Sequence, residues 1–131
     1  MLDMLESQIF TLIKTKFSKK LKDRYPDLTF TTSDRVETKP KFPTVYIHEM
    51  PGMEDGADTE GNEINAVLCS FQIEVTTNKQ MNETKEIMNE ILRIMKSMRF
   101  QVISMPEFQN TNNVYRRVAR FRRMIADKDF L

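Results

Sequence analysis

The stretch VLCSFQIEVT, residues 67–76, is the segment that decides the fold. Every second residue in it is apolar, and the series is Val67, Cys69, Phe71, Ile73 and Val75. Successive side chains of a β-strand point to opposite faces of a sheet, so this period of two predicts a strand with one buried face and one mostly polar face. The other segments of the chain must then supply neighbouring strands and a cover for the apolar face.

Four further segments are predicted to be strands from their length and from their β-branched and aromatic residues. They are residues 28–32, 44–50, 100–105 and 114–125. Pro51-Gly52 is expected to end the second of these segments, and Pro106 is expected to close the one that begins at Phe100. Ser33 to Pro43 is predicted to be a turn or an irregular edge, because it holds two prolines and mixed charges.

Two amphipathic helices are predicted from apolar residues that recur at spacings of three and four. The first runs from about Asp3 to Arg24, and its apolar stripe is Leu5, Ile9, Leu12, Ile13, Phe17 and Leu21. Pro26 disfavours helical geometry at Tyr25 and stops this helix. The second begins near Met81 and keeps its spacing to about Met98.

The order of elements is therefore helix, three strands, helix and two strands. It predicts an α+β fold in which two helices pack on one face of an antiparallel or mixed sheet of about five strands. A length of 131 residues fits a single domain, residues 1–131. The other sheet face would stay exposed unless another subunit covers it.

The charges of the chain nearly cancel, with 20 basic and 19 acidic residues, but they are unevenly placed. Basic residues crowd the segment 14–24 and the segment 116–123. Residues 52–63 carry acids and three glycines without a basic residue, and we expect them to form a flexible acidic loop. Separate basic and acidic segments in a near-neutral chain favour complementary contacts with neighbouring molecules, including copies of itself.

We expect the protein not to be an enzyme and to need no metal or cofactor. The single histidine, His48, has no acidic or cysteine cluster beside it, and Cys69 lies on the apolar side of its strand, where a core role is favoured. The acids near Asp55 lack the ligand spacing of an EF-hand, and the chain has no glycine-rich phosphate loop. The N-terminal segment resembles neither a signal peptide nor a membrane span.

The last predicted strand is rich in arginine, and the period of two sorts its side chains into two groups. Arg116, Arg120 and Arg122 share one side, and Arg117 and Arg123 share the other. Three interpretations stay open: solvated arginines, a nucleic-acid surface, and guanidinium–carboxylate pairs across a subunit interface. The acids that could serve the third interpretation in a subunit interface are Glu54, Asp55, Asp58 and Glu60.

The layout also resembles a known family. An amphipathic N-terminal helix, a strand reading PTVYI (Pro43 to Ile47), an acidic loop, and a closing strand reading VYRRVARF (Val114 to Phe121) follow one another in this order. Together they resemble the tail terminator, or tail completion, proteins of long-tailed bacteriophages and prophages.

The resemblance implies a structural protein of the virion, made in the bacterial host cytoplasm and located at the head-proximal end of the tail. Such proteins form a ring, expected here to be a homo-hexamer, that caps the tail tube and stops its polymerisation. Its partners would be the tail tube protein and a head-completion or neck protein, and DNA would pass through the ring without being read. A head–tail joining protein of the same virion is the alternative, and a small nucleic-acid-binding module is a further one.

Overall fold

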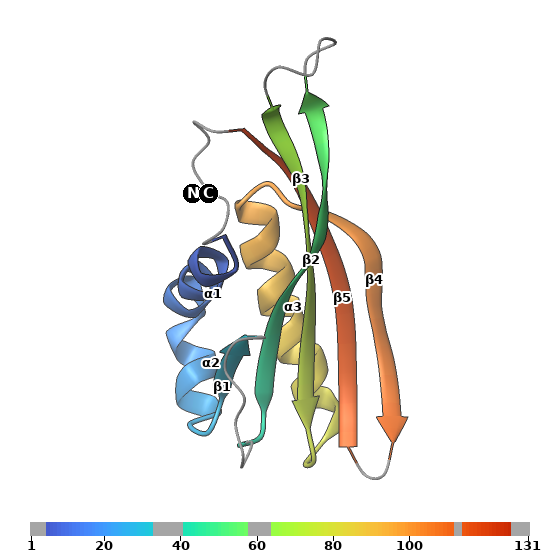
Figure 1. Cartoon of the computed structure of the whole chain (residues 1–131). Coiled ribbons are helices and arrows are strands. Elements are labelled where there is room, and N and C mark those ends of the chain that lie inside the picture. The colour runs from blue at the N-terminus through green and yellow to red at the C-terminus, as the bar shows by residue number, and fades with distance from the viewer. Residues whose placement is uncertain (1–4, 33–40, 58–63, 112–113, 127–131) are drawn as a thin grey trace.

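The computed structural model describes the backbone of residues 5–32, 41–57, 64–111 and 114–126, together with most of their side chains. The elements are α1 (Leu5–Lys16), α2 (Lys19–Arg24), β1 (Thr29–Thr32), β2 (Thr44–Ala57), β3 (Ile64–Thr77), α3 (Met81–Ser97), β4 (Gln101–Thr111) and β5 (Val114–Ala126). Figure 1 shows them with the same labels.

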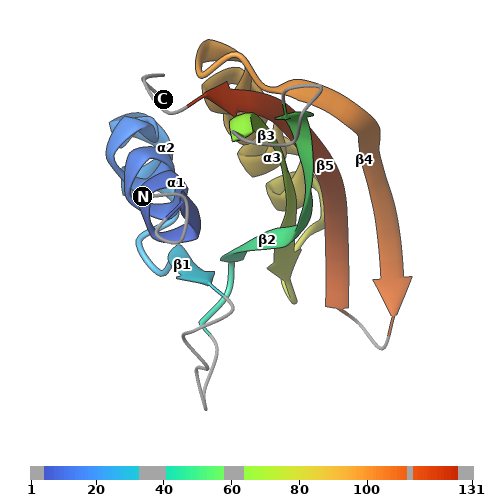
Figure 2. The same cartoon turned by 45° about the horizontal axis from the view of Figure 1, so that its top comes forward.

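The strands form one mixed sheet in the order β1-β2-β3-β5-β4. β1 is parallel to β2, and the other pairs are antiparallel. All three helices lie on one face of this sheet, as the two views show (Figures 1 and 2). The predicted α+β class, with helices on one face of a mixed sheet of five strands, is therefore confirmed.

The strand that was expected to decide the fold lies at the centre of the sheet. Its alternation is confirmed where side chains are described, because Cys69, Phe71, Ile73 and Val75 are all buried and the residues between them are only partly covered. Phe71 pairs across the sheet with Phe121, and both are fully buried. The ring of Phe71 also meets that of Phe100 edge to face, with centroids 5.8 Å apart.

The predicted N-terminal helix is two helices, so the expectation of one continuous helix was wrong. Ser18 has an extended backbone (φ −58°, ψ 127°) between them, although the apolar spacing continues. The break lets Phe17 turn into the core, where its ring meets that of Phe30 edge to face at 5.3 Å. The end of α2 at Arg24 is as predicted.

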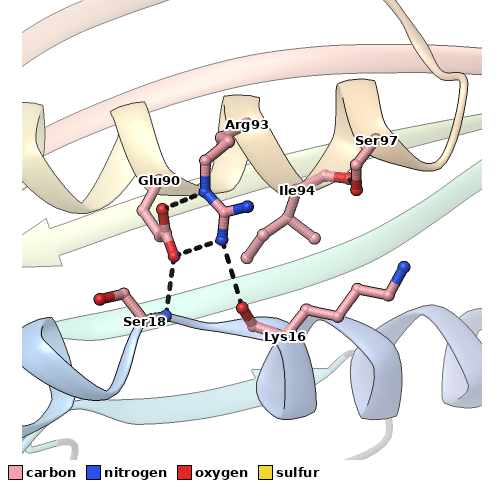
Figure 3. A network of polar contacts seen from close by, with 6 residues as sticks. All are labelled: Lys16, Ser18, Glu90, Arg93, Ile94 and Ser97. Atoms are coloured by element: carbon pink, nitrogen blue, oxygen red, sulfur yellow. Dashed lines mark hydrogen bonds and ion pairs between the residues drawn. The ribbon is translucent and has the colours of Figure 1, made fainter.

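A buried carboxylate holds this break against α3 (Figure 3). The Ser18 N–H donates to Glu90 Oε2 at 2.7 Å, and Arg93 donates to both oxygens of Glu90 at 2.7 and 2.8 Å. Arg93 also donates to the Lys16 carbonyl at 3.3 Å, at the end of α1. The hydrogen bonds from Arg93 are the main cause that lowers the pKa of Glu90, against the opposing effect of its burial.

The C-terminus of α3 turns the chain sharply into β4. Arg99 has a positive φ of 66°, and its N–H donates to the Lys96 carbonyl while the Phe100 N–H donates to the Met95 carbonyl. This is the Schellman pattern that closes many helices. It places Phe100 in the core, directly after the last turn of the helix.

The hairpin of β2 and β3 is longer than predicted. β2 continues past Pro51-Gly52 to Ala57, so the loop expected to begin at Gly52 is strand in its first half, and residues 58–63 lie outside the described residues. Between the pairs Met50–Ser70 and Met53–Leu68, β2 contains one residue more than β3. This bulge takes up the proline, which has no N–H to give to a strand ladder.

The fourth strand was also expected to be shorter. β4 continues through Pro106 to Thr111 instead of ending at Met105. It has one extra residue between Val102 and Ser104 and another between Ser104 and Glu107, relative to β5. Pro106 falls in the second of these bulges, on the outer strand of the sheet, where a missing N–H is tolerated.

The side edge of β2 is covered by a helix side chain. β1 pairs with β2 only up to Ile47, and beyond it the Glu49 N–H donates to Glu6 Oε2 of α1 at 3.0 Å. Burial, and after it the neighbouring Glu6 carboxylate, raise the pKa of Glu49.

The first prediction concerns the core. We expect Phe71→Ala to lower the free energy of unfolding by about 3–5 kcal/mol, because it removes a fully buried ring and leaves a cavity. Met81→Ala is the control, since Met81 is 50% exposed and its truncation should cost less than about 0.5 kcal/mol. Urea denaturation followed by circular dichroism measures both, and equal effects would contradict the assignment of Phe71 to the core.

The second prediction concerns the Glu90 contacts. Glu90→Gln should cost about 1.5–3 kcal/mol at neutral pH, because an amide cannot accept from both Ser18 and Arg93 as a carboxylate does. A carboxyl group with a lowered folded-state pKa stabilises the fold above its unfolded-state pKa, and this stabilisation is lost as the pH falls through the folded-state pKa.

The stability difference between wild type and Glu90→Gln should therefore be constant near neutral pH and shrink in acid. Denaturation curves over a range of pH values measure this difference. Asp23→Asn removes an exposed carboxylate and is the matched control. A difference that stays the same in acid would show that the charge of Glu90 does not stabilise the fold.

Candidate interaction surface

Among the described residues, no helix or strand covers the face of the sheet opposite the helices (Figure 1); we call it the open face. The residues on this face are identified from the pairing of residues across β2, β3 and β5 and from the alternation of buried and less buried side chains along each strand. They are Tyr46, His48, Met50, Leu68, Ser70, Gln72, Glu74, Thr76, Arg116, Val118, Arg120, Arg122 and Met124.

The two predicted groups of arginines lie on opposite faces of the sheet. Arg116, Arg120 and Arg122 are exposed on the open face, whereas Arg117 is half-buried and Arg123 is buried on the helix side. The sorting by a period of two is thus confirmed. The five arginines of β5 therefore do not form one surface.

A polar ladder runs along the open face between two of its arginines. Arg120 Nε donates to Gln72 Oε1 at 3.0 Å, and Gln72 Nε2 donates to Glu74 Oε1 at 3.0 Å. Glu74 Oε1 in turn lies 3.6 Å from Arg116 Nη1. These exposed contacts add little to stability, but they restrict the orientation of the long side chains on this face.

The part of the open face around Arg120 and Arg122 combines positive charge with exposed apolar groups. Arg122 Nε donates to Gln101 Oε1 of β4 at 3.4 Å. Met124, two residues after Arg122 on β5, is 41% exposed. Ile103 on β4 is 42% exposed and lies in the sequence between Gln101 and Ser104, which pair with Arg122 and Arg120. We call Arg120, Arg122, Ile103 and Met124 the arginine patch.

Among the described side chains, no carboxylate belongs to a residue paired across the strands with Arg120 or Arg122; we call each such set of paired residues a row. Arg120 pairs with Gln72 and Ser104, and Arg122 pairs with Ser70 and Gln101. The nearest acids in the register, Glu74 and Glu107, both belong to the row of Val118. The patch is therefore positively charged and is not neutralised within its own rows.

The helix-side arginines have a structural role. Arg123 Nη1 donates to the Met98 carbonyl at 3.1 Å, at the C-terminus of α3, where a positive charge also suits the helix dipole. Arg117 Nε donates to Thr84 Oγ1 at 3.5 Å, and its guanidinium lies 5.3 Å from the centre of the Phe108 ring. Both side chains fasten α3 to the sheet.

The acids predicted to pair with the arginines lie where their side chains are not described. Glu54 and Asp55 belong to β2, and Asp58 and Glu60 lie outside the described residues. Asp55 pairs with Ala66 of β3, which pairs in turn with Ala126 of β5. Ala126 lies four residues after Arg122, which is about 13 Å along the strand. Within one copy, the described partners of the open-face arginines are Gln72, Glu74 and Gln101, which sequence reasoning missed.

The residues weighed for chemistry occupy sites that favour structural roles. Burial is the main cause that raises the pKa of Cys69 to about 11, so this group is a thiol and not a nucleophilic thiolate at neutral pH. His48 is half-buried on the open face beside Tyr46, with ring centroids 5.9 Å apart. Within the described part of the chain, no group of three or more His, Cys, Asp or Glu residues could hold a metal ion.

The two basic segments of the sequence do not join into one surface. The N-terminal one forms α1 and α2 in the helix layer, away from the open face (Figure 2). Some of its cations have partners there: Lys22 Nζ donates to the Lys14 carbonyl at 2.6 Å, and Arg24 pairs with Glu86. Over the described residues, no helix has the length and apolar character needed to cross a membrane.

Neither a protein-family model nor a curated protein sequence matches this chain. The arrangement of the open face and its charges is therefore what bears on function.

The third prediction separates the two groups of arginines. Arg123→Met should lower the free energy of unfolding by about 1.5–3 kcal/mol, because it leaves the Met98 carbonyl without its charged donor. Arg120→Met is the same chemical change on the open face and should cost less than about 1 kcal/mol. Thermal and urea denaturation measure both, and a larger cost at Arg120 would reverse the assignment of the two faces.

Proposed function

We propose that this chain is a structural assembly protein of a long-tailed bacteriophage or prophage, which forms a ring that caps the tail tube. The observation that carries the proposal is the open face of the sheet, with its ordered arginines and exposed apolar side chains. The resemblance of the sequence to tail terminator proteins supplies the kind of assembly. The ring, expected to be a hexamer, would stop tail polymerisation and give the head a docking surface.

The composition of the open face suits contact between proteins. Arginine and methionine are enriched in protein interfaces, and the planar guanidinium group pairs well with carboxylates that lose their water. The ladder through Gln72 holds Arg120 in place, so less side-chain freedom is lost when a partner binds. A surface of this kind needs no bound cofactor to recognise its partner.

A terminator must present two different surfaces, one that joins the tube and one that does not continue the stack. Helices cover only one face of the sheet (Figure 1), so the chain has two different surfaces, and this difference supports the proposal. Its partners would be further copies of itself, the tail tube protein and a head-completion or neck protein. DNA would pass through the ring without sequence-specific contacts, at the head-proximal end of the tail.

The two alternative functions are a head–tail joining protein and a nucleic-acid-binding module. A head–tail joining protein of the neck would use the same kind of surface, and the choice of partner separates the two. A nucleic-acid-binding module has less support, because the basic segments lie on opposite faces and the ladder pairs Arg116 with Glu74.

The fourth prediction tests the capping function. Purified chain added to polymerising tail tube protein should shorten the tubes, and electron microscopy should show ring-shaped particles at one end of each tube. Both effects should increase with the ratio of the chain to the tube protein, because each cap removes one growing end.

The control is the same tube protein polymerised without the chain. Binding to the head connector with no effect on the tubes would favour the neck alternative. Unchanged tube lengths, together with bare tube ends at excess chain, would contradict the terminator proposal.

A further inference from the structure

We propose that the open face along β5 binds an extended segment of another protein, with two carboxylates at alternate positions and an apolar residue beyond each of them. This inference deepens the proposed function and rests on it for one point, that the open face is a contact between proteins. It names the chemistry of the partner segment and the two arginines that would bind its carboxylates, Arg120 and Arg122.

The two arginines are held in the same way by glutamines of the neighbouring strands. Arg120 Nε donates to Gln72 Oε1 of β3 at 3.0 Å, and Arg122 Nε donates to Gln101 Oε1 of β4 at 3.4 Å. β5 lies between these two strands in the sheet. Each bond uses only one nitrogen of the guanidinium group. No described residue accepts a hydrogen bond from the two Nη atoms of either arginine.

A pair of Nη atoms without an acceptor suits a carboxylate. The planar guanidinium group can donate two parallel hydrogen bonds to the two oxygens of one carboxylate. Both arginines are exposed, so a carboxylate can approach them from solvent. Because the glutamines already restrict these side chains, less conformational freedom is lost when the partner binds. Arg120 and Arg122 therefore provide two prepared sites for carboxylates.

The spacing of the arginines determines the spacing of the carboxylates. Arg120 and Arg122 are two positions apart on one strand, so their side chains leave the same face about 7 Å apart. An extended segment that lies along β5 has the same repeat, because its alternate side chains are also about 7 Å apart. Its acids must then occupy positions i and i+2, since adjacent residues point to opposite sides of an extended chain.

Apolar side chains continue the same line at both ends. Val118 precedes Arg120 and Met124 follows Arg122, each at the next position of β5 on this face. Apolar residues of the partner opposite them would add the burial that exposed charge pairs alone do not provide. The line along β5 is thus apolar, basic, basic and apolar. Since this order is the same in both directions, the complementary segment fits parallel or antiparallel to β5.

A protein segment fits this line better than nucleic acid does, although phosphate groups also accept hydrogen bonds from arginine. Binding to a phosphate backbone depends on many cations, whereas the described part of this line has two arginines without a carboxylate partner. The carboxylate of Glu74 also accepts from Gln72 at 3.0 Å, and its charge would repel a phosphate chain that continued along the face.

The fifth prediction is a binding experiment with a synthetic peptide, Leu-Thr-Glu-Thr-Glu-Thr-Leu, blocked at both ends. Titration of the peptide into the isotope-labelled chain should shift the Nε–Hε signals of Arg120 and Arg122 in nuclear magnetic resonance spectra until they saturate. The amide signals of β5 should shift with them. The double variant Arg120→Met with Arg122→Met should bind the peptide at least about tenfold more weakly, because it loses both guanidinium–carboxylate pairs.

Two controls match these changes. Lys85→Met with Lys96→Met removes the same charge from exposed positions of α3 and should leave binding unchanged. The peptide Leu-Glu-Thr-Thr-Thr-Glu-Leu has the same composition, but when extended it places its acids on the side opposite its leucines. It should bind wild type at least about tenfold more weakly than the first peptide. Circular dichroism and denaturation confirm that every variant is folded.

The absence of a saturable shift at β5 up to the solubility limit of the peptide would overturn the inference. Equal affinity for the arginine variant, or for the second peptide, would do the same. A single-stranded oligonucleotide that shifts the same arginine signals and binds more tightly than the first peptide would also overturn it, in favour of nucleic acid.

The tube-capping experiment separates this inference from the proposed function. If the chain shortens tail tubes but does not bind the peptide, the inference fails while the proposed function stands. Binding of the peptide through Arg120 and Arg122, with no effect on the tubes, would support the inference and contradict the terminator proposal.

Discussion

The one-sided burial of β3 is the constraint on which the rest of the structure depends. Its apolar residues share one buried core with those of α3 and pair with Ala119 and Phe121 on β5, while the residues between them stay only partly covered. Each large side chain buried in this way contributes about 1.5–3 kcal/mol, so a register slip by one residue would expose the core and is strongly disfavoured. The fixed register then determines which side chains of β2 and β5 reach the open face, and in what order.

β5 shows how one strand can serve two purposes. Its odd-numbered residues belong to the core layer, so Arg117 and Arg123 are tied to Thr84 and to the Met98 carbonyl of α3. Its even-numbered residues belong to the open face, where Arg120 keeps its charge in solvent. Arginine therefore stabilises the fold on one face of the sheet and is exposed on the other. Whether its residue number is odd or even decides which face it occupies.

Much of the fold could be predicted from the sequence, because periods of 2 and 3.6 are direct consequences of burial on one face. The alternation in β3, the spacing in α3 and the sorting of the arginines were all visible in this way. The break at Ser18 was not, since it depends on Glu90, which is distant in the sequence and approaches only in the folded chain. The continuation of β2 and β4 past their prolines was missed because bulges are set by pairing with a neighbour, which local composition does not reveal. The candidate site was predicted in part: the arginines were identified, but Gln72 and Gln101 carry no signal of their own until the sheet aligns them.

An exposed β-layer at high local concentration carries a risk of aggregation, because free strand edges can pair with other chains and grow into fibrils. The edges of this sheet limit that risk. β1 is only four residues long, and beyond it the carboxylate of Glu6 occupies the Glu49 N–H. At the opposite edge, β4 has two bulges and Pro106, which interrupt the regular ladder that an added strand would need. The chemistry of both edges therefore opposes amyloid-like growth of this sheet.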